Sequence, residues 1–133
     1  MVAGPSSEFV TEFFVQNGEK PFEVKIKGLK DPVAQTRIYA RLAKVRSGTL
    51  GDQKALGKGL WELKVDYGPG YRVYFGKYDS QVGDESETRK LIILLLCGDK
   101  KSQDTDIETA RAYWKSYKAE KARLKEAKIA RSK

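Results

Sequence analysis

Histidine is missing from this sequence and cysteine occurs only once, and these two shortages exclude most of the usual catalytic and metal-binding groups. Without histidine there is no serine–histidine–aspartate arrangement and no histidine-based ribonuclease pair. Common zinc sites need several cysteines or histidines, so the sequence predicts no metal and no cofactor. Cys97 cannot form a disulfide within the chain, and its place at the end of an apolar run is typical of a small buried side chain.

Long hydrophobic runs are missing as well. The longest, Leu91 to Cys97, is too short to span a bilayer. No amino-terminal stretch combines a basic start with an apolar core, so we expect no signal peptide and a cytoplasmic protein. The 133 residues fit one domain, which can bury about two-thirds of the surface of its unfolded chain.

Acidic residues are too few to balance the basic ones. The chain has 26 lysines and arginines against 18 aspartates and glutamates, which leaves a net charge of +8. Such an excess favours polyanionic partners, because binding to phosphates releases counterions. The alternative is an ordinary basic protein with no role in nucleic-acid binding.

The first third of the chain is typical of a strand followed by two helices. The β-branched and aromatic run 9–15 predicts a strand, and Asn17-Gly18 predicts the turn after it. Residues 21–29 alternate like a strand but also carry apolar side chains at helical spacing, and their leading proline favours a short helix. Asp31-Pro32 is the expected start of a second helix that runs to about Val45 and ends at Ser47-Gly48.

The clearest pattern is a β-hairpin over residues 61–75, preceded by a possible short strand near 53–56. A three-residue Gly-Pro-Gly loop would keep every apolar side chain of the hairpin on one face. On the other face this register places Asp66 opposite Arg72 and Lys64 opposite Tyr74. An ion pair between Asp66 and Arg72 is therefore one expectation for the arginine.

The last third predicts a buried strand and a helix. Residues 76–88 are polar and acidic, which indicates a mobile hairpin tip, whereas residues 91–97 are apolar throughout and should form a central strand covered on both faces. A final helix is capped by Ser102 or Asp104. Its apolar stripe comprises Ile107, Ala110, Trp114 and Tyr117. We interpret this stripe as core rather than as a platform for nucleotides.

These elements follow the order β-α-α-β-β-β-β-α, or one strand fewer. They predict an α+β fold in which a mostly antiparallel sheet of four or five strands carries the helices on one face. The expected domain covers residues 9–117, after a flexible tail at 1–8. Residues 118–133 are basic and Ala-rich, which predicts a solvated helical extension or a frayed tail.

Basic side chains on the sheet form the candidate site. Cleavage of RNA by its own 2′-hydroxyl needs a proton acceptor, a charge clamp on the phosphorane and a proton donor. Arg72 suits the clamp because its planar guanidinium holds two phosphate oxygens. A lysine could accept the proton only if neighbouring cations lower its pKa. The candidate catalytic residues are Arg72, Lys100, Lys101, Tyr113 and Tyr117, and the candidate substrate-binding residues are Lys54, Lys58, Lys64 and Tyr74. Lys100 and Lys101 as ordinary loop charges are the alternative.

Three stretches read D-P-V-A-Q-T-R-I, then G-L-W-E-L-K-V-D-Y-G-P-G-Y-R-V-Y-F, and then L-I-I-L-L-L-C-G-D-K-K-S-Q-D-T-D-I-E-T-A-R-A-Y-W. Together they resemble the RelE/ParE toxin superfamily, in particular the HigB-like addiction module killer proteins of bacterial type II toxin–antitoxin systems. The similarity covers about residues 9–117. It implies a microbial-RNase-like fold and a toxin that cleaves mRNA in the ribosomal A site. It also implies a cognate antitoxin of helix-turn-helix type, through which the toxin meets operator DNA.

The resemblance also implies roles for single residues. Arg72 matches the phosphate-contacting arginine of the family, and Lys100 and Lys101 match the basic residues after the last strand. Lys54 and Lys58 lie where such toxins carry lysines before the hairpin. Known ribonucleases of the family place a catalytic aromatic residue or histidine near the C-terminus, where this chain offers only Tyr113 and Tyr117. Other members poison DNA gyrase, so a gyrase inhibitor and a plain RNA-binding protein are the alternative functions.

Overall fold

The computed structural model describes residues 10–46, 53–82 and 87–131, and it does not describe the side chains of residues 46 and 80–89. The elements follow the order β1 (Val10–Phe13), α1 (Pro21–Lys27), α2 (Pro32–Arg46), β2 (Gln53–Gly57), β3 (Leu60–Val65), β4 (Tyr71–Val82), β5 (Glu87–Asp99) and α3 (Gln103–Arg131). This order confirms the predicted one. The predicted tail at 1–8 and the predicted helix end at Ser47-Gly48 lie outside the described residues.

The five strands form one mixed sheet in the order β1-β5-β4-β3-β2. Strand β1 pairs with β5 in parallel, and the other neighbours are antiparallel. The predicted mostly antiparallel α+β fold is therefore confirmed. Strand β5 is buried along 91–97 on both faces, as its continuous apolar run predicts.

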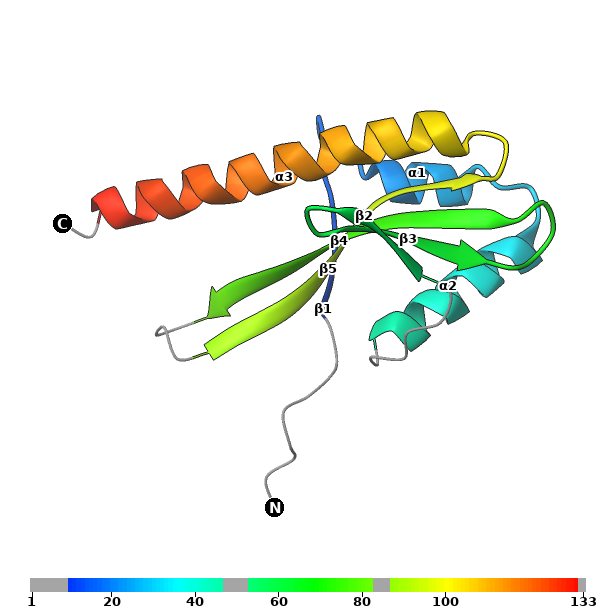
Figure 1. The fold of residues 1–133 in the computed structure, drawn as a ribbon, viewed down its shortest axis with the longest axis horizontal. Helices are drawn as coiled ribbons and strands as arrows, with labels where there is room; N and C mark the ends of the chain where they lie inside the picture. Colours follow the sequence, from blue (N-terminus) through cyan, green and yellow to red (C-terminus); the bar gives the residue numbers. More distant parts are fainter. Residues whose placement is uncertain (1–9, 47–52, 83–86, 132–133) are drawn as a thin grey trace, which may run out of the picture.

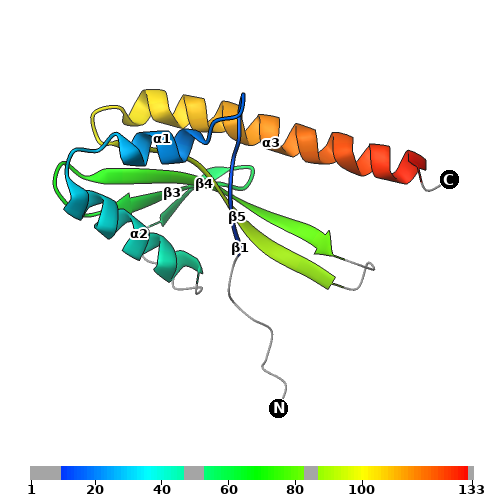
Figure 2. The ribbon, with the colours of Figure 1, turned by 180° about the vertical axis from the view of Figure 1, so that it is seen from behind.

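Helices cover both faces of the sheet, so the prediction that they gather on one face is wrong. Helices α1 and α2 pack on one face, where Phe22 and Ile38 meet Val73. Helix α3 packs on the other, where Trp114 meets Tyr74. In Figure 1 helix α3 lies above the sheet and α2 below it, and Figure 2 shows the same separation from behind. A strand that is apolar on both sides needs cover on both sides.

The hairpin between β3 and β4 keeps the predicted face but not the predicted register. Val65 pairs with Tyr71, so the loop has five residues and the pairing is shifted by two positions. Because the side-chain period of a strand is two, this shift leaves the apolar residues together. Tyr67 lies in this loop rather than in the ladder, and its hydroxyl donates to Oδ2 of Asp31 at 2.9 Å, at the start of α2. Arg72 therefore lies opposite Lys64, and its predicted pairing with Asp66 is wrong.

The prediction that residues 76–88 form a mobile hairpin tip is wrong for most of this segment, because the two strands extend much further. Strand β4 continues to Val82 and pairs with β5 from Glu87 onward, which leaves only 83–86 between them. Figure 1 shows this pair of strands extending beyond the rest of the sheet. Backbone hydrogen bonds of an antiparallel ladder sustain a strand even where its side chains are polar.

Local signals place the helices well. The short α1 forms over the ambiguous segment 21–29. The backbone amide of Val33 donates to Oδ1 of Asp31 at 2.9 Å, which confirms Asp31 as a cap. Helix α3 follows Ser102 and continues without interruption to Arg131, so the predicted extension is helical. None of the helices in the described ranges is long and apolar enough to cross a bilayer.

Replacement of Gly76 by alanine should destabilise the fold by about 1–3 kcal/mol, because the new methyl group would overlap the Trp114 ring. Urea unfolding followed by circular dichroism measures the change. Gly28→Ala is the matched control, since its Cβ would come no closer than 3.4 Å to any neighbour. Equal stability of the two variants would contradict this packing of α3 on β4.

Candidate functional site

Four of the nine candidate site residues, Lys54, Lys64, Arg72 and Tyr74, lie on the face of the sheet that α3 covers. Lys54 pairs with Glu62, and Glu62 pairs with Tyr74, which makes one row across three strands. Lys64 and Arg72 form the next row. Directly paired residues of antiparallel strands point to the same face, so all five side chains share it. Lys54 and Lys64 are exposed there, whereas the other three are buried.

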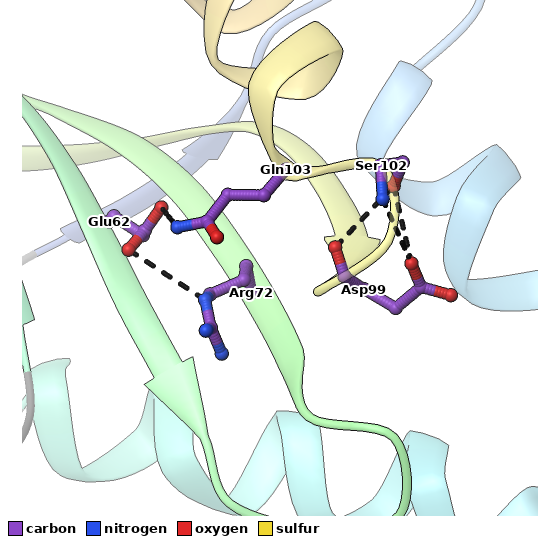
Figure 3. A network of polar contacts seen from close by, with 5 residues as sticks. All are labelled: Glu62, Arg72, Asp99, Ser102 and Gln103. Atoms are coloured by element: carbon purple, nitrogen blue, oxygen red, sulfur yellow. Dashed lines mark hydrogen bonds and ion pairs between the residues drawn. The ribbon is translucent and has the colours of Figure 1, made fainter.

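A carboxylate–guanidinium pair is at the centre of this face. Nε of Arg72 lies 3.8 Å from Oε1 of Glu62, and the two side chains are only 10% and 8% exposed. Nε2 of Gln103 donates to Oε2 of Glu62 at 2.9 Å, so the first turn of α3 holds the carboxylate in place (Figure 3). Buried charges persist in proteins when they are paired and hydrogen-bonded. Glu62 and Gln103 were missed in the sequence, because the predicted register set Asp66 against the arginine.

Arg72 has more donors than partners. Its Nε and Nη1 are buried, and within the described ranges neither donates a hydrogen bond. Buried donors in proteins nearly always find an acceptor, so these two N–H groups are suited to an anionic ligand. Arg72 does not stand on a face of the sheet that is free of helices, because the first turn of α3 packs beside it.

Lys100 and Lys101 lie close to Arg72 in the fold. Arg72 pairs with Gly98, two residues before Lys100. The backbone amide of Lys100 donates to the carbonyl of Gly70 at 3.0 Å. A Cβ on Gly70 would lie 3.7 Å from Nη1 of Arg72. The loop that carries both exposed lysines therefore begins beside the guanidinium.

Hydrogen bonds fix this loop. Oδ1 of Asp99 accepts from the backbone amides of Lys101 at 2.9 Å and Ser102 at 3.2 Å. The hydroxyl of Ser102 donates to Oδ2 of Asp106, which is buried against Gly98. Any side chain at position 98 would collide with that carboxylate. The lysines are thus carried by a rigid turn rather than by a loose loop.

Two candidate tyrosines belong to the core instead. Tyr74 is fully buried, which rules out stacking on an RNA base, and burial followed by the charge of Glu62 raises the pKa of its hydroxyl. Tyr117 is buried against Trp114, with ring centroids 5.5 Å apart. Burial followed by the charge of Glu12 raises the pKa of Tyr117. The interpretation of Trp114 and Tyr117 as core is confirmed, and Tyr74 lies in the same core cluster. Neither tyrosine is exposed on the surface of the sheet.

Three candidates lie far from Arg72. Tyr113 and Tyr117 follow Gln103 on α3 by 10 and 14 residues, which is about 15 and 21 Å along the helix. Lys58 precedes β3, at the opposite end of that strand from Lys64, and its carbonyl accepts from Nε1 of Trp114 at 2.8 Å. The structure therefore does not bring Tyr113, Tyr117 or Lys58 to the buried pair.

Cys97 is buried, as predicted. It lies on the face that α1 and α2 cover, which is the opposite side of the sheet from Arg72. Burial, followed by the charge of Asp106, raises the pKa of its thiol to about 12. The thiolate that a nucleophile requires is therefore absent at neutral pH.

Over 90 residues the chain is 37% identical to an uncharacterized protein of Haemophilus influenzae (strain ATCC 51907 / DSM 11121 / KW20 / Rd). The match covers 68% of this chain and 82% of that protein. The chain therefore belongs to the same family as the Haemophilus influenzae protein. No family model matches the chain, and no solved structure matches it significantly.

Replacement of Glu62 by leucine should destabilise the protein by about 3 kcal/mol, because the buried guanidinium of Arg72 loses its counter-charge. The double variant Glu62→Leu/Arg72→Leu should recover most of this loss, since no unpaired charge remains. Urea unfolding of both single variants and the double variant measures the coupling. Strictly additive effects would show that the two side chains do not interact.

Proposed function

We propose that this member of the family is the toxin of a bacterial type II toxin–antitoxin pair and that it cuts mRNA. The mixed α+β sheet with two helices before the hairpin and one after it agrees with the RelE-like, microbial-RNase-like arrangement that the sequence resembles. Chemistry at the sheet supports a ribonuclease in particular. The site that carries the proposal is the buried pair of Glu62 and Arg72 with exposed lysines around it.

The single observation that carries the proposal of a ribonuclease is that the Arg72 guanidinium has buried hydrogen-bond donors without acceptors in the described part of the chain. Nε and Nη1 of Arg72 are buried and donate no hydrogen bond to any of the residues that the structure describes. A phosphorane, with its additional negative charge, supplies the acceptors that these groups lack. In a site with little water, such donors stabilise developing charge far more than they would in solution.

Glu62 supplies the proton acceptor that the lysines were expected to provide. Its carboxylate takes the proton of the ribose 2′-hydroxyl, and the 2′-oxygen attacks the adjacent phosphorus. Arg72 holds the phosphorane oxygens. The bond from phosphorus to the 5′-oxygen breaks, and that oxygen takes a proton from Lys100 or Lys101. The products are a 2′,3′-cyclic phosphate and a free 5′-hydroxyl.

The exposed lysines bind the rest of the strand. Lys54 and Lys64 share the face of Arg72, and Lys100 and Lys101 follow the end of β5. Because the pair itself is about nine-tenths buried, only one phosphate reaches it, and the neighbouring phosphates remain at the rim. This division fits a cytoplasmic enzyme that cuts mRNA in the ribosomal A site. In this proposal a helix-turn-helix antitoxin inhibits the enzyme and links it to operator DNA.

A gyrase inhibitor on the same scaffold is the second candidate. The observation that favours it is the ion pair itself, because a structural salt bridge would equally explain why Arg72 and Glu62 are buried. In this case the outer face of α2, with exposed Arg37 and Lys44, would bind the partner protein. Cleavage would then be absent.

Arg72→Lys and Glu62→Gln should each lower transcript cleavage by about 100-fold or more, because one loses the planar fork and the other the proton acceptor. Induced expression followed by primer extension on cellular transcripts measures cutting, with growth inhibition as a second readout. Circular dichroism melts show whether the variants are folded. Tyr113→Phe is the control and should cut normally, because Tyr113 lies about 15 Å along α3 from Gln103.

The outcomes separate the candidates. Loss of cutting and toxicity in folded Arg72→Lys supports the nuclease. Intact transcripts with a defect in DNA supercoiling would overturn it in favour of a gyrase inhibitor. A wild-type protein that neither kills nor cuts, yet binds RNA with steep salt dependence, would indicate a plain RNA-binding protein.

A further inference from the structure

Helix α3 is much longer than the sheet it covers. Its last buried residue is Tyr117, and each of the 14 residues from Lys118 to Arg131 is exposed or half-exposed. Figure 1 shows this second half projecting past the body of the domain. Packing against the sheet therefore does not explain why the helix continues.

One side of the projecting half is a stripe of lysines. Lys118, Lys121, Lys125 and Lys128 are spaced by three, four and three residues, which places them on one face of a helix. We call these four residues the lysine stripe. Nζ of Lys118 lies 5.3 Å from the centre of the Trp114 ring, and Nζ of Lys121 lies 5.3 Å from the centre of the Tyr117 ring. The stripe thus continues the line of the side chains that pack on the sheet.

The carboxylates of this segment lie elsewhere on the helix. Glu120, Arg123 and Glu126 follow one another at intervals of three, on the side away from the lysine stripe. Oε2 of Glu120 accepts from Nε of Arg123 at 3.1 Å, so this acid is already paired. Within the lysine stripe, each lysine has another lysine as its charged neighbour at three or four residues.

Such a row of like charges destabilises a helix, so helix stability does not account for it. A membrane-surface helix would need an apolar stripe beside the charges. The exposed apolar residues Leu124 and Ile129 are five positions apart and lie on different sides of the helix. An acidic coiled-coil partner would need a repeating apolar seam, which this segment lacks.

We propose that the lysine stripe binds the phosphate backbone of structured RNA, with no reading of base sequence. Its four ammonium groups span about 15 Å along the helix, enough to contact several consecutive phosphates. Lysine offers a compact charge rather than a bidentate fork for base edges, which fits a positioning contact. The choice of RNA among polyanions rests on the proposed function. The stripe would hold a structured RNA such as ribosomal RNA while the buried pair acts on the message.

The test uses the full chain and a fluorescein-labelled 16-base-pair RNA duplex, with fluorescence anisotropy over a series of salt concentrations. The variant K118Q/K121Q/K125Q/K128Q should lower the slope of log affinity against log salt by about 3.6, since four phosphate contacts on a duplex are lost. Its affinity at about 0.1 M salt should fall by more than about tenfold. K20Q/K25Q/K27Q/K30Q removes the same charge around α1, on the other face of the sheet, and should change the slope by less than about 1.

Additional variants and a DNA duplex serve as controls for this experiment. K125Q/K128Q touches neither aromatic ring and should show about half of the loss, with an unchanged helical signal in circular dichroism. Glu62→Gln should keep duplex binding while it loses cleavage, so failure of the nuclease and failure of the stripe are separate outcomes. Equal slopes for the stripe variant and the α1 control would overturn the proposal. Tighter binding to a DNA duplex of the same sequence would overturn the choice of RNA.

Discussion

The structure depends on one strand that is apolar on both of its faces. Residues 91–97 of β5 leave no side that can face water, so helices must cover the sheet above and below. Helices α1 and α2 take one face and α3 takes the other. This requirement decides where the chemistry lies, because α3 must begin directly after β5. Its first turn therefore packs over the end of the strands, where Glu62 and Arg72 meet.

Burial changes what those two charges can do. At the surface, an arginine and a glutamate separated by 3.8 Å would be screened by water and would contribute little. Under α3 they interact in a medium of lower dielectric, held by Gln103 on one side and by neighbouring strands on the other. The glutamate satisfies the net charge of the arginine but not all of its hydrogen-bond donors. That imbalance distinguishes a site able to receive an anion from a salt bridge that is complete in itself.

Local chemistry made the elements predictable, and contacts between distant segments limited the rest. The proline at 21, the Asp31 cap and the alternation of β3 each act within a few residues, so the helices and strands followed from the sequence. The five-residue hairpin loop contains Tyr67, which bonds to Asp31, and no pattern within the hairpin reveals this contact with a distant segment. Arg72, Lys54 and Lys64 lie on one face of the sheet, and Lys100 and Lys101 lie in the loop that follows β5. Glu62 was missed with the register. Tyr113 is separated from Arg72 by the length of α3, and Lys58 is separated from it by the length of β3.

The edge strand β1 has a consequence for how the molecule is made. Val10 lies beside Leu91, so roughly eighty residues separate the two members of the parallel pair. A ribosome must deliver almost the whole chain before β1 finds its partner, and until then the amino-terminal strand has no sheet to join. Incomplete chains lack β5, and with it both the core and the turn beside Arg72. A translation product that stops before β5 would consequently lack the central strand on which the sheet is built.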